Sequence, residues 1–259
     1  RILKFGRKSF VKDICTSNNV SFKILLNPVL NGCVDETIAI QGTWEQSLTT
    51  WLYKNIKSDS VFVDIGANIG YHSLFVKAAF KNAVEVHAIE PIPELAHQIR
   101  DSVRINAYEK FHVHNCGLGE QAGEMNFHVR DENMGGSSVN AYDDFGLVKT
   151  SKINRIELKT LDKLLADTNS VDVIKIDIEG YEFEALKGAK NILKNNHPII
   201  IAEFSPMFYE YDKVNKSCEF IEYLESFGYR FETIEGKTLD LKSLVHENKN
   251  LTQLDIVCH

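Results

Sequence analysis

The segment Val61–Tyr71, with the sequence VFVDIGANIGY, constrains the fold of this chain more than any other stretch. Its first five residues, Val61–Ile65, are almost all apolar and predict a buried strand, and Tyr71–Ala79 predicts a helix. Between them, Gly66 and Gly70 let the backbone turn tightly and approach a ligand without obstruction by a Cβ atom. The N–H groups that open the helix add hydrogen-bond donors. The segment therefore predicts a strand–turn–helix unit that binds a ligand.

Apolar strands continue to alternate with helices along the chain. Further strands are expected at Glu85–Ile89, Phe111–Asn115, Val171–Ile176 and Ile199–Glu203, and further helices at Pro93–Asn106, Tyr181–Leu193 and Ser217–Phe227. This alternation is typical of a parallel sheet covered on both faces, so the fold class is α/β and Rossmann-like. The last two expected strands, Tyr229–Ile234 and Leu254–Val257, are joined by a loop without a convincing crossover helix. They predict an antiparallel pair that ends the sheet.

Residues 1–57 are expected to form an N-terminal α+β extension of a main domain that spans residues 58–259. The extension should contain strands at Val20–Leu26 and Thr37–Gln41. The segment Thr43–Gln46 fits a capping box and predicts the start of a helix. Since no Pro/Gly-rich linker separates the two parts, we expect the extension to pack on the core. It is also the candidate surface for an acceptor or for a homodimer.

A long insertion, residues 120–159, follows the third expected strand of the main domain. It contains a predicted hairpin at Glu124–Val129 and a polar loop at 133–138. Loops of this length in a compact domain often have a function. A substrate lid and a plain surface loop are equally consistent with the sequence.

The turn after the first strand of the main domain differs from a dinucleotide-binding fingerprint. The pattern G-x-G-x-x-G requires glycine where Asn68 and Tyr71 stand. The nearby Asp64 would repel a pyrophosphate, whereas S-adenosylmethionine carries an ammonium and a sulfonium group and no phosphate. We therefore expect S-adenosylmethionine as the cofactor. The residues of this turn expected to bind it are Asp64, Gly66, Asn68 and Gly70.

Two further polar residues end the next strands. Glu90 stands twenty residues after Gly70, where an acidic side chain can accept hydrogen bonds from both ribose hydroxyls. Asn115 ends the third strand, where it could meet the adenine edge or cap the strand structurally. Glu90 and Asn115 therefore complete the predicted cofactor site.

A second acidic cluster lies in the segment IKIDIEGYE and at the end of the following strand. If the strand before Asp177 adjoins Val61–Ile65, the side chains of Asp177, Glu179 and Glu203 share one edge of the sheet. Such carboxylates could supply a general base for a hydroxyl nucleophile. Asp177 and Glu203 are also candidate ligands of a divalent cation. We expect Glu182, in contrast, only to cap a helix start.

Basic and histidine residues near these motifs allow fewer conclusions. Lys175 lies inside an apolar strand two residues before Asp177, and we expect a structural ion pair between them because an unpaired buried ammonium is costly. His72 is a candidate catalytic residue near the reactive end of the cofactor, with helix capping or packing as the alternative. His112 and His114 share one strand face and are interpreted as packing residues.

Together, these motifs resemble the FkbM family of class I S-adenosylmethionine-dependent methyltransferases, over roughly residues 37–235. The segments that carry the resemblance are Val61–Leu74 (VFVDIGANIGYHSL), Glu90–Pro91, Thr160–Leu165 (TLDKLL), Val173–Ala189 (VIKIDIEGYEFEALKGA) and Ile199–Pro206 (IIIAEFSP). The resemblance implies a seven-stranded sheet with an antiparallel final hairpin. It also implies O-methylation of a hydroxyl on a small metabolite or glycan, by in-line SN2 displacement with a carboxylate as base.

The charge of the chain weighs against a polynucleotide acceptor. Its 259 residues include 29 Lys and Arg against 36 Asp and Glu, a net charge of −7, whereas phosphate binding needs clustered basic residues. No nucleic-acid partner is therefore expected, which disfavours the alternative of an RNA ribose methyltransferase. A non-catalytic module that binds S-adenosylmethionine is the other alternative. The apolar runs are too short to span a membrane, and a cytoplasmic location is expected.

Overall fold

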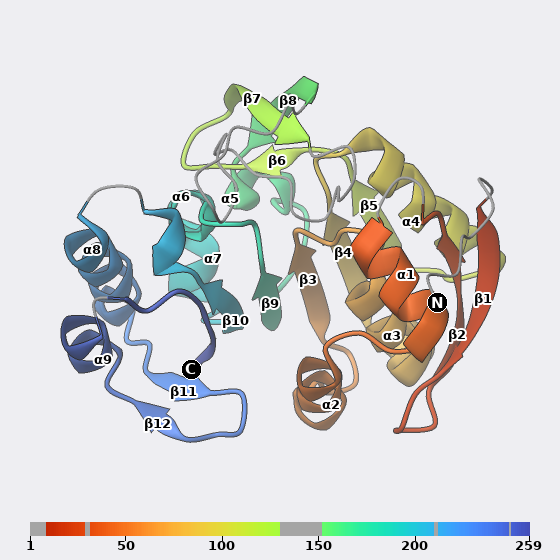
Figure 1. Cartoon of the computed structure of the whole chain (residues 1–259), viewed down its shortest axis with the longest axis horizontal. Coiled ribbons are helices and arrows are strands. Elements are labelled where there is room, and N and C mark those ends of the chain that lie inside the picture. The colour runs from red at the N-terminus through yellow and green to blue at the C-terminus, as the bar shows by residue number, and fades with distance from the viewer. Residues whose placement is uncertain (1–8, 29–31, 130–151, 210–211, 249) are drawn as a thin grey trace.

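The computed structural model describes residues 9–28, 32–129, 152–209, 212–248 and 250–259 (Figure 1). Its centre is an eight-stranded sheet in the order β12-β11-β13-β10-β9-β3-β4-β5. In chain order the strands are β3 (Val61–Ile65), β4 (Glu85–Ile89), β5 (Phe111–His114), β9 (Val173–Ile176), β10 (Ile199–Phe204), β11 (Phe231–Thr233), β12 (Thr238–Leu239) and β13 (Leu254–Cys258). Strands β5, β4, β3, β9 and β10 run parallel, and β13 pairs antiparallel with both β10 and β11. The predicted α/β class and the antiparallel end of the sheet are confirmed.

The order of the strands reverses at β3, which pairs with β4 on one side and with β9 on the other. In the register with β9, Asp64 lies opposite Lys175 and Ile65 lies opposite Ile176. The expected neighbourhood of these two strands is therefore confirmed. Because the strands are parallel, the carboxyl ends of β3, β4, β9 and β10 lie at one edge, where α/β sheets commonly bind ligands.

Two apolar layers cover the sheet because successive strand residues point to opposite faces. On one face, Phe62 packs in a core formed largely by the N-terminal part of the chain. The strands of this layer are the hairpin β1 (Phe10–Cys15) and β2 (Ser21–Leu26). Its helices are α1 (Gly32–Gln41), α2 (Gln46–Asn55), α3 (Tyr71–Phe80) and α4 (Pro93–Ile105). On the other face, Val63 packs with helices of the C-terminal half. These are α5 (Leu161–Leu164), α6 (Glu182–Lys187), α7 (Lys190–Asn195), α8 (Lys213–Ser226) and α9 (Leu241–Glu247). Short 3₁₀ helices occur at Lys81–Ala83 and Pro206–Phe208.

A small separate sheet is formed by β6 (Gly117–Leu118), β7 (Gly123–Val129) and β8 (Lys152–Lys159) in the order β6-β8-β7. Strand β7 contains the segment Glu124–Val129, where a hairpin was predicted, and it pairs antiparallel with β8. The polar loop at 133–138 lies outside the described residues.

The predicted strand Thr37–Gln41 is wrong, because these residues form the second half of α1. Val34 and Ile38, four residues apart, share one helical face and are buried, whereas Ile40 is exposed. Asp35 anchors the helix, since its carboxylate accepts hydrogen bonds from the backbone N–H of Asn27 (2.7 Å) and the amide of Gln98 (3.0 Å). Tertiary contacts thus outweigh the local β propensity of this segment.

The predicted capping box at Thr43–Gln46 is also wrong. Helix α2 begins at Gln46, and its N-cap residue Glu45 has a left-handed backbone without a side-chain cap. The side chain of Glu45 instead extends to His72 (2.8 Å). A distant contact therefore decides how this helix begins.

The structure also differs from the prediction in the length of one helix and in the number of strands and helices near the end of the chain. The expected helix Tyr181–Leu193 is split into α6 and α7 around Gly188, where a Cβ atom would lie 2.1 Å from the carbonyl oxygen of Gly119. The sheet contains an eighth strand, the two-residue β12, where seven were predicted. The expected loop between the last two strands contains α9, which buries Leu241 and Val245 on one face.

Candidate active site

The turn between β3 and α3 is shaped by backbone that only a few residue types adopt. Gly66 and Gly70 have φ values of 76° and 79°, and Asn68 has 53°. A Cβ atom on Gly66 would lie 1.9 Å from the carbonyl oxygen of Asp177, so the turn packs directly on the segment that follows β9. The N–H of Gly66 donates to the carbonyl of Ile89 (3.0 Å), which ties the turn to β4 as well.

Glu90 fixes the turn from the end of β4. Its carboxylate accepts hydrogen bonds from the backbone N–H groups of Asn68 (2.9 Å) and Ile92 (2.8 Å), and the residue is only 4% exposed. Burial raises the pKa of this carboxyl to about 8, although the two N–H donors act in the opposite direction. Each oxygen retains capacity to accept a further hydrogen bond from a ligand.

A buried ion-pair network lies beneath the turn. The ammonium of Lys175 is 3.5 Å from carboxylate oxygens of both Asp64 and Asp177, and Asp64 also accepts a hydrogen bond from the hydroxyl of Ser73 (2.7 Å). Burial lowers the pKa of Lys175, but the charges of Asp177 and Asp64 outweigh it and raise the pKa above its ordinary value. The expected structural ion pair between Lys175 and Asp177 is present, and it extends to Asp64.

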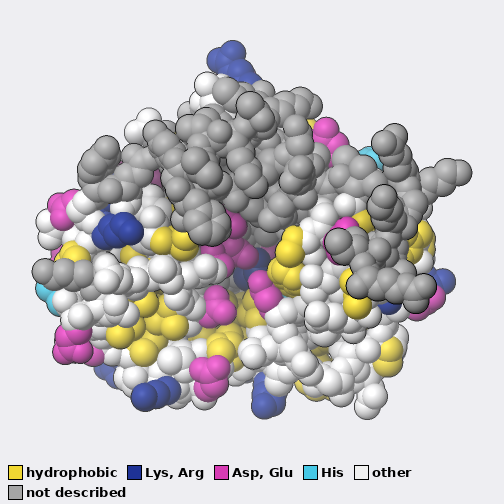
Figure 2. Space-filling model, viewed as in Figure 1, with side chains coloured by type: hydrophobic (Ala, Val, Ile, Leu, Met, Phe, Trp, Pro, Cys, Tyr) yellow, Lys and Arg dark blue, Asp and Glu magenta, His cyan; other side chains and the backbone are white. Residues whose placement is uncertain are grey.

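These elements surround a cavity of about 220 Å³ at the carboxyl edge of the sheet. Seven of the predicted site residues line it: Gly66, Asn68, His72, Glu90, Asp177, Glu179 and Glu203. We call Gly66, Asn68 and Glu90 the turn side of the cavity, and Asp177, Glu179 and Glu203 the acid side. Figure 2 shows Asp and Glu side chains gathered near the middle of this face.

Glu203 lies near the end of β10, on the acid side of the cavity. Burial raises its pKa to about 9, and the negative charges of Asp177 and Glu179 act in the same direction. Its carboxylate accepts hydrogen bonds from the hydroxyl of Ser205 (3.1 Å) and from the amide of Gln253. In this environment Glu203 retains a proton at neutral pH, and the approach of a positive charge would favour its release.

Glu179 and Glu182 have different tasks in the turn that precedes α6. Glu179 has a φ of 55°, and its side chain lines the cavity. Glu182 is buried, and one carboxylate oxygen accepts hydrogen bonds from the N–H groups of Ile178 (3.0 Å) and Gly180 (3.2 Å). Burial raises the pKa of Glu182 to about 7. These contacts hold the turn before α6, whose N-cap residue Tyr181 has no side-chain cap, so the capping role of Glu182 stays a prediction.

Three predicted cofactor residues lie behind the cavity wall rather than on it. Asp64 is 1% exposed and is directed at Lys175 and Ser73, and Gly70 packs against Ile99. The amide of Asn115 donates to the carbonyls of Glu90 (2.9 Å) and Pro91 (3.0 Å). These contacts favour a supporting role for all three, and direct contact with a cofactor stays a prediction for each.

His72 lines the cavity from the first turn of α3 and is 5% exposed. Its Nε2 atom hydrogen-bonds Glu45, and its Nδ1 atom is buried without a hydrogen-bond partner among the described residues. Burial raises the pKa of Glu45, but the hydrogen bond and charge of His72 outweigh it and lower the pKa to about 2. The orphaned Nδ1 can serve a ligand that enters the cavity.

The candidate metal ligands Asp177 and Glu203 lack a third ligand in the described part of the chain. Among the described residues, three ligand atoms within 4.8 Å of one another occur at Glu85, His87 and His112. These three residues do not line this cavity. At Asp177, the ammonium of Lys175 already supplies a positive charge. A divalent cation at Asp177 and Glu203 therefore stays a prediction.

Comparison with known proteins decides the family. The profile described as methyltransferase FkbM domain matches residues 64–231, which include the turn, Glu90 and the whole acid side. The chain belongs to this family. In the described residues, no helix is both long and apolar enough to cross a membrane.

Relatives of this FkbM-domain chain have low identity to it. A protein named Methyltransferase 1 from Beauveria bassiana is 25% identical over 146 residues, which cover 50% of this chain and 58% of that protein. Hexuronic acid methyltransferase AglP from Haloferax volcanii is 27% identical over 161 residues, which cover 61% of each chain. The chain thus matches about three fifths of the length of these relatives.

A solved structure supports the fold. The crystal structure of methyltransferase FkbM from Methylobacillus flagellatus superposes with a TM-score of 0.51 at 20% identity, covering 79% of this chain and 44% of that one. The FkbM-domain chain therefore has the class I methyltransferase fold.

Sequence reasoning missed Glu45 and Gln253 as residues of the site. Glu45 reaches His72 from the N-terminal extension, and Gln253 reaches Glu203 from the segment before β13. Neither lies in a motif with a recognisable spacing. Only the folded chain brings Glu45 to the cavity and Gln253 to Glu203.

Proposed function

We propose that this chain is an S-adenosylmethionine-dependent O-methyltransferase that acts on a hydroxyl group of a sugar or glycan. The observation that supports this most directly is the meeting of the turn side and the acid side in one cavity. The turn side suits a nucleoside, and the acid side can accept a proton from a hydroxyl. The same family has a relative named as a hexuronic acid methyltransferase, which supports a saccharide acceptor.

The donor set of the cavity fits a cationic cofactor. Its ionisable lining includes Glu45, Glu90, Asp177 and Glu203, and the ammonium of Lys175 is already shared between two carboxylates. A positive group that enters this lining would favour the ionised forms of Glu90 and Glu203, whereas a phosphate would not. Glu90 would accept hydrogen bonds from ribose hydroxyls, because its oxygens have remaining acceptor capacity. Bound S-adenosylmethionine would supply an electrophilic methyl group.

When it is ionised, Glu203 is a stronger base than an ordinary carboxylate, because its pKa is raised to about 9. A general base is most effective when its pKa lies near the working pH. A positive charge in the cavity would favour the ionised form, so that Glu203 can take the proton of the acceptor hydroxyl. Asp177, held by Lys175, would orient that hydroxyl through a hydrogen bond. Alignment of donor and acceptor would supply much of the remaining rate enhancement.

The test is a screen of acceptors with labelled S-adenosylmethionine, preceded by calorimetry. The unmodified chain should bind S-adenosylmethionine, and label should appear on neutral sugars, uronic acids or glycans but not on RNA. The screen is run with and without EDTA, so that a cation at Asp177 and Glu203 would be detected as lost turnover. Absence of S-adenosylmethionine binding would refute the whole proposal. Binding without transfer to any acceptor would favour a non-catalytic module.

A further inference from the structure

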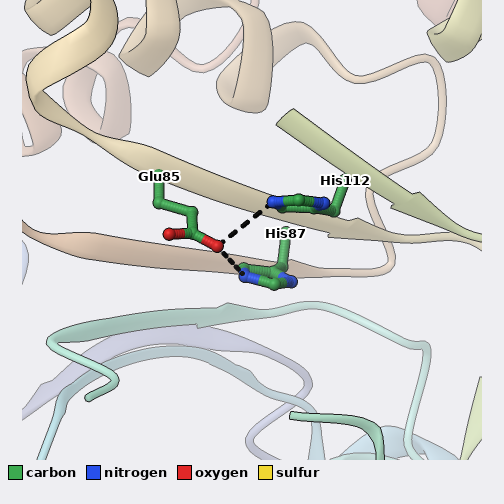
Figure 3. A group of neighbouring side chains, drawn as sticks. All are labelled: Glu85, His87 and His112. Carbon is green, nitrogen blue, oxygen red and sulfur yellow. Dashed lines mark hydrogen bonds and ion pairs between the residues drawn. The ribbon is translucent and has the colours of Figure 1, made fainter. Parts of the chain in front are cut away.

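A cluster of metal-binding side chains lies on the sheet away from the cavity. Glu85 and His87 belong to β4, and His112 lies directly opposite His87 on the edge strand β5. All three point to the face opposite Val86 and Ala88, which pack with α3 and α4. Figure 3 shows one carboxylate oxygen of Glu85 facing a nitrogen of each imidazole ring.

The distances in this cluster resemble those between ligands of one small ion. Nε2 of His87 and Nε2 of His112 are each 3.1 Å from the same oxygen of Glu85, and all three ligand atoms lie within 4.8 Å of one another. In a tetrahedral zinc site with bonds of about 2.1 Å, neighbouring ligand atoms are about 3.4 Å apart. Small rotations of the side chains would therefore bring the three atoms around one ion.

The buried histidine of the cluster is also oriented from behind. His87 is 5% exposed, and its Nδ1 atom forms a hydrogen bond with Nε2 of His114 (3.0 Å). The two rings are nearly parallel, with an interplanar angle of 3°. When Nδ1 carries the proton, Nε2 presents its lone pair towards Glu85 and His112. A partner on the second ring nitrogen is the usual arrangement for a metal-bound histidine.

We propose that Glu85, His87 and His112 form a binding site for a divalent transition-metal ion such as Zn²⁺. Two imidazoles and one carboxylate are a donor set that suits zinc and its neighbours better than Mg²⁺ or Ca²⁺. The side chains of His112 and Glu85 are 48% and 35% exposed, so solvent can reach the ion and complete its coordination. The site is separate from the cavity, which none of the three residues lines.

A metal ion here would join the edge strand β5 to β4. These strands end at Asn115 and Glu90, and the amide of Asn115 already donates to the carbonyl of Glu90. The ion would add a further link three residues or more before that contact. We therefore expect it to stabilise the folded chain, and we expect it to do so whether or not the proposed acceptor is correct.

The experiment is calorimetric titration of the metal-free chain with ZnCl₂. One ion should bind per chain, and His112→Asn or Glu85→Gln should each weaken the binding at least tenfold. The matched control is His97→Asn, because His97 is 71% exposed on α4 and pairs only with Asp101 in the described contacts. This control should leave zinc affinity unchanged.

Two further readouts separate this site from others. Cobalt substitution should produce visible absorption bands that His112→Asn removes. Glu203→Gln, in the cavity, should leave zinc affinity unchanged. Zinc at about 100 times its Kd should raise the Tm of the unmodified chain by on the order of 5 °C, and that of the His112→Asn chain by much less. Equal zinc affinity in the unmodified and His112→Asn chains, or zinc binding lost in Glu203→Gln instead, would overturn the proposal.

Discussion

The turn side and the acid side of the cavity each hold a carboxyl group with a raised pKa, but the surroundings of the two groups differ. Glu90 is buried and held by two backbone N–H donors, which limit the rise to about 8. Burial and then the charges of neighbouring acids raise the pKa of Glu203 to about 9. Backbone donors hold a carboxylate in one position. Neighbouring negative charges instead raise its pKa, and a cation that approaches lowers the pKa again, so that the carboxyl group can release its proton. The contrast suits binding on one side and proton transfer on the other.

The largest effect should come from Gly66→Ala, which tests how rigid the turn side is. The added Cβ atom would lie 1.9 Å from a backbone oxygen, and both backbones would have to shift. We expect the free energy of unfolding to fall by about 4 kcal/mol or more, measured by urea denaturation. The control is Gly236→Ala, which has a similar φ of 83° and no atom within 4 Å of the new Cβ. It should cost about 1–2 kcal/mol, and equal losses would mean that the close approach at Gly66 is unimportant.

The second prediction concerns proton transfer on the acid side. Glu203→Gln and Asp177→Asn should each lower kcat by roughly 10²–10⁴-fold, the range for loss of general-base assistance. The Kd for S-adenosylmethionine at pH 7 should change only a few-fold in Glu203→Gln, because Glu203 is protonated there and glutamine resembles that form. Glu219→Gln, an exposed carboxyl on α8, serves as the control. If these acid-side variants bound the cofactor more weakly and kept their kcat, the acid side would serve cofactor binding and not proton transfer.

The third prediction tests binding on the turn side. Glu90→Gln replaces one acceptor oxygen with an amide that cannot accept from Asn68 or Ile92. The amide also replaces an oxygen that would accept a hydrogen bond from a ribose hydroxyl, a loss of about 1–3 kcal/mol, so cofactor affinity should fall about 10–100-fold in calorimetry. The surface variant Glu109→Gln should bind as the unmodified chain does. If Glu90→Gln also binds normally, Glu90 does not position the turn for the cofactor.

The last prediction concerns the pH dependence of stability. Glu203 has a pKa of about 9 in the folded chain against about 4.3 in an unfolded chain, so the folded state binds more protons between these values. Its contribution to the free energy of unfolding should therefore fall as the pH rises from about 5 to about 9. Glu203→Gln removes this loss, so its Tm relative to the unmodified chain should increase with pH. A Tm difference that is constant from pH 5 to pH 9 would contradict the raised pKa.

Much of the fold was predictable because local patterns and tertiary structure agree. The strands Val61–Ile65 and Glu85–Ile89 were placed correctly, because both are short, mostly buried segments of the parallel sheet, and Val61–Ile65 is buried throughout. Thr37–Gln41 was misassigned because its helical face is defined by contacts of Asp35 with Asn27 and Gln98, which no local pattern shows.

The candidate site also has a part that the sequence predicts and a part that depends on tertiary packing. Motif spacing alone predicted the glycine turn, Glu90 and the acids at Asp177, Glu179 and Glu203, because strand-end residues of a parallel sheet meet at one edge. Spacing could not show that Asp64 lies behind the cavity wall on Lys175, since burial depends on packing from both sides of the strand.

The sequence by itself determined the class of fold, the family and the acidic character of the site, because these depend on residue types and on their order along strands. The tertiary structure decided which carboxyls face the cavity, how far their pKa values rise, that Glu45 lines the cavity and that Gln253 contacts Glu203. It also brought Glu85, His87 and His112 together across two strands. The physical reason is that desolvation and Coulomb interactions depend on distances in space, which residue spacing along the chain does not specify.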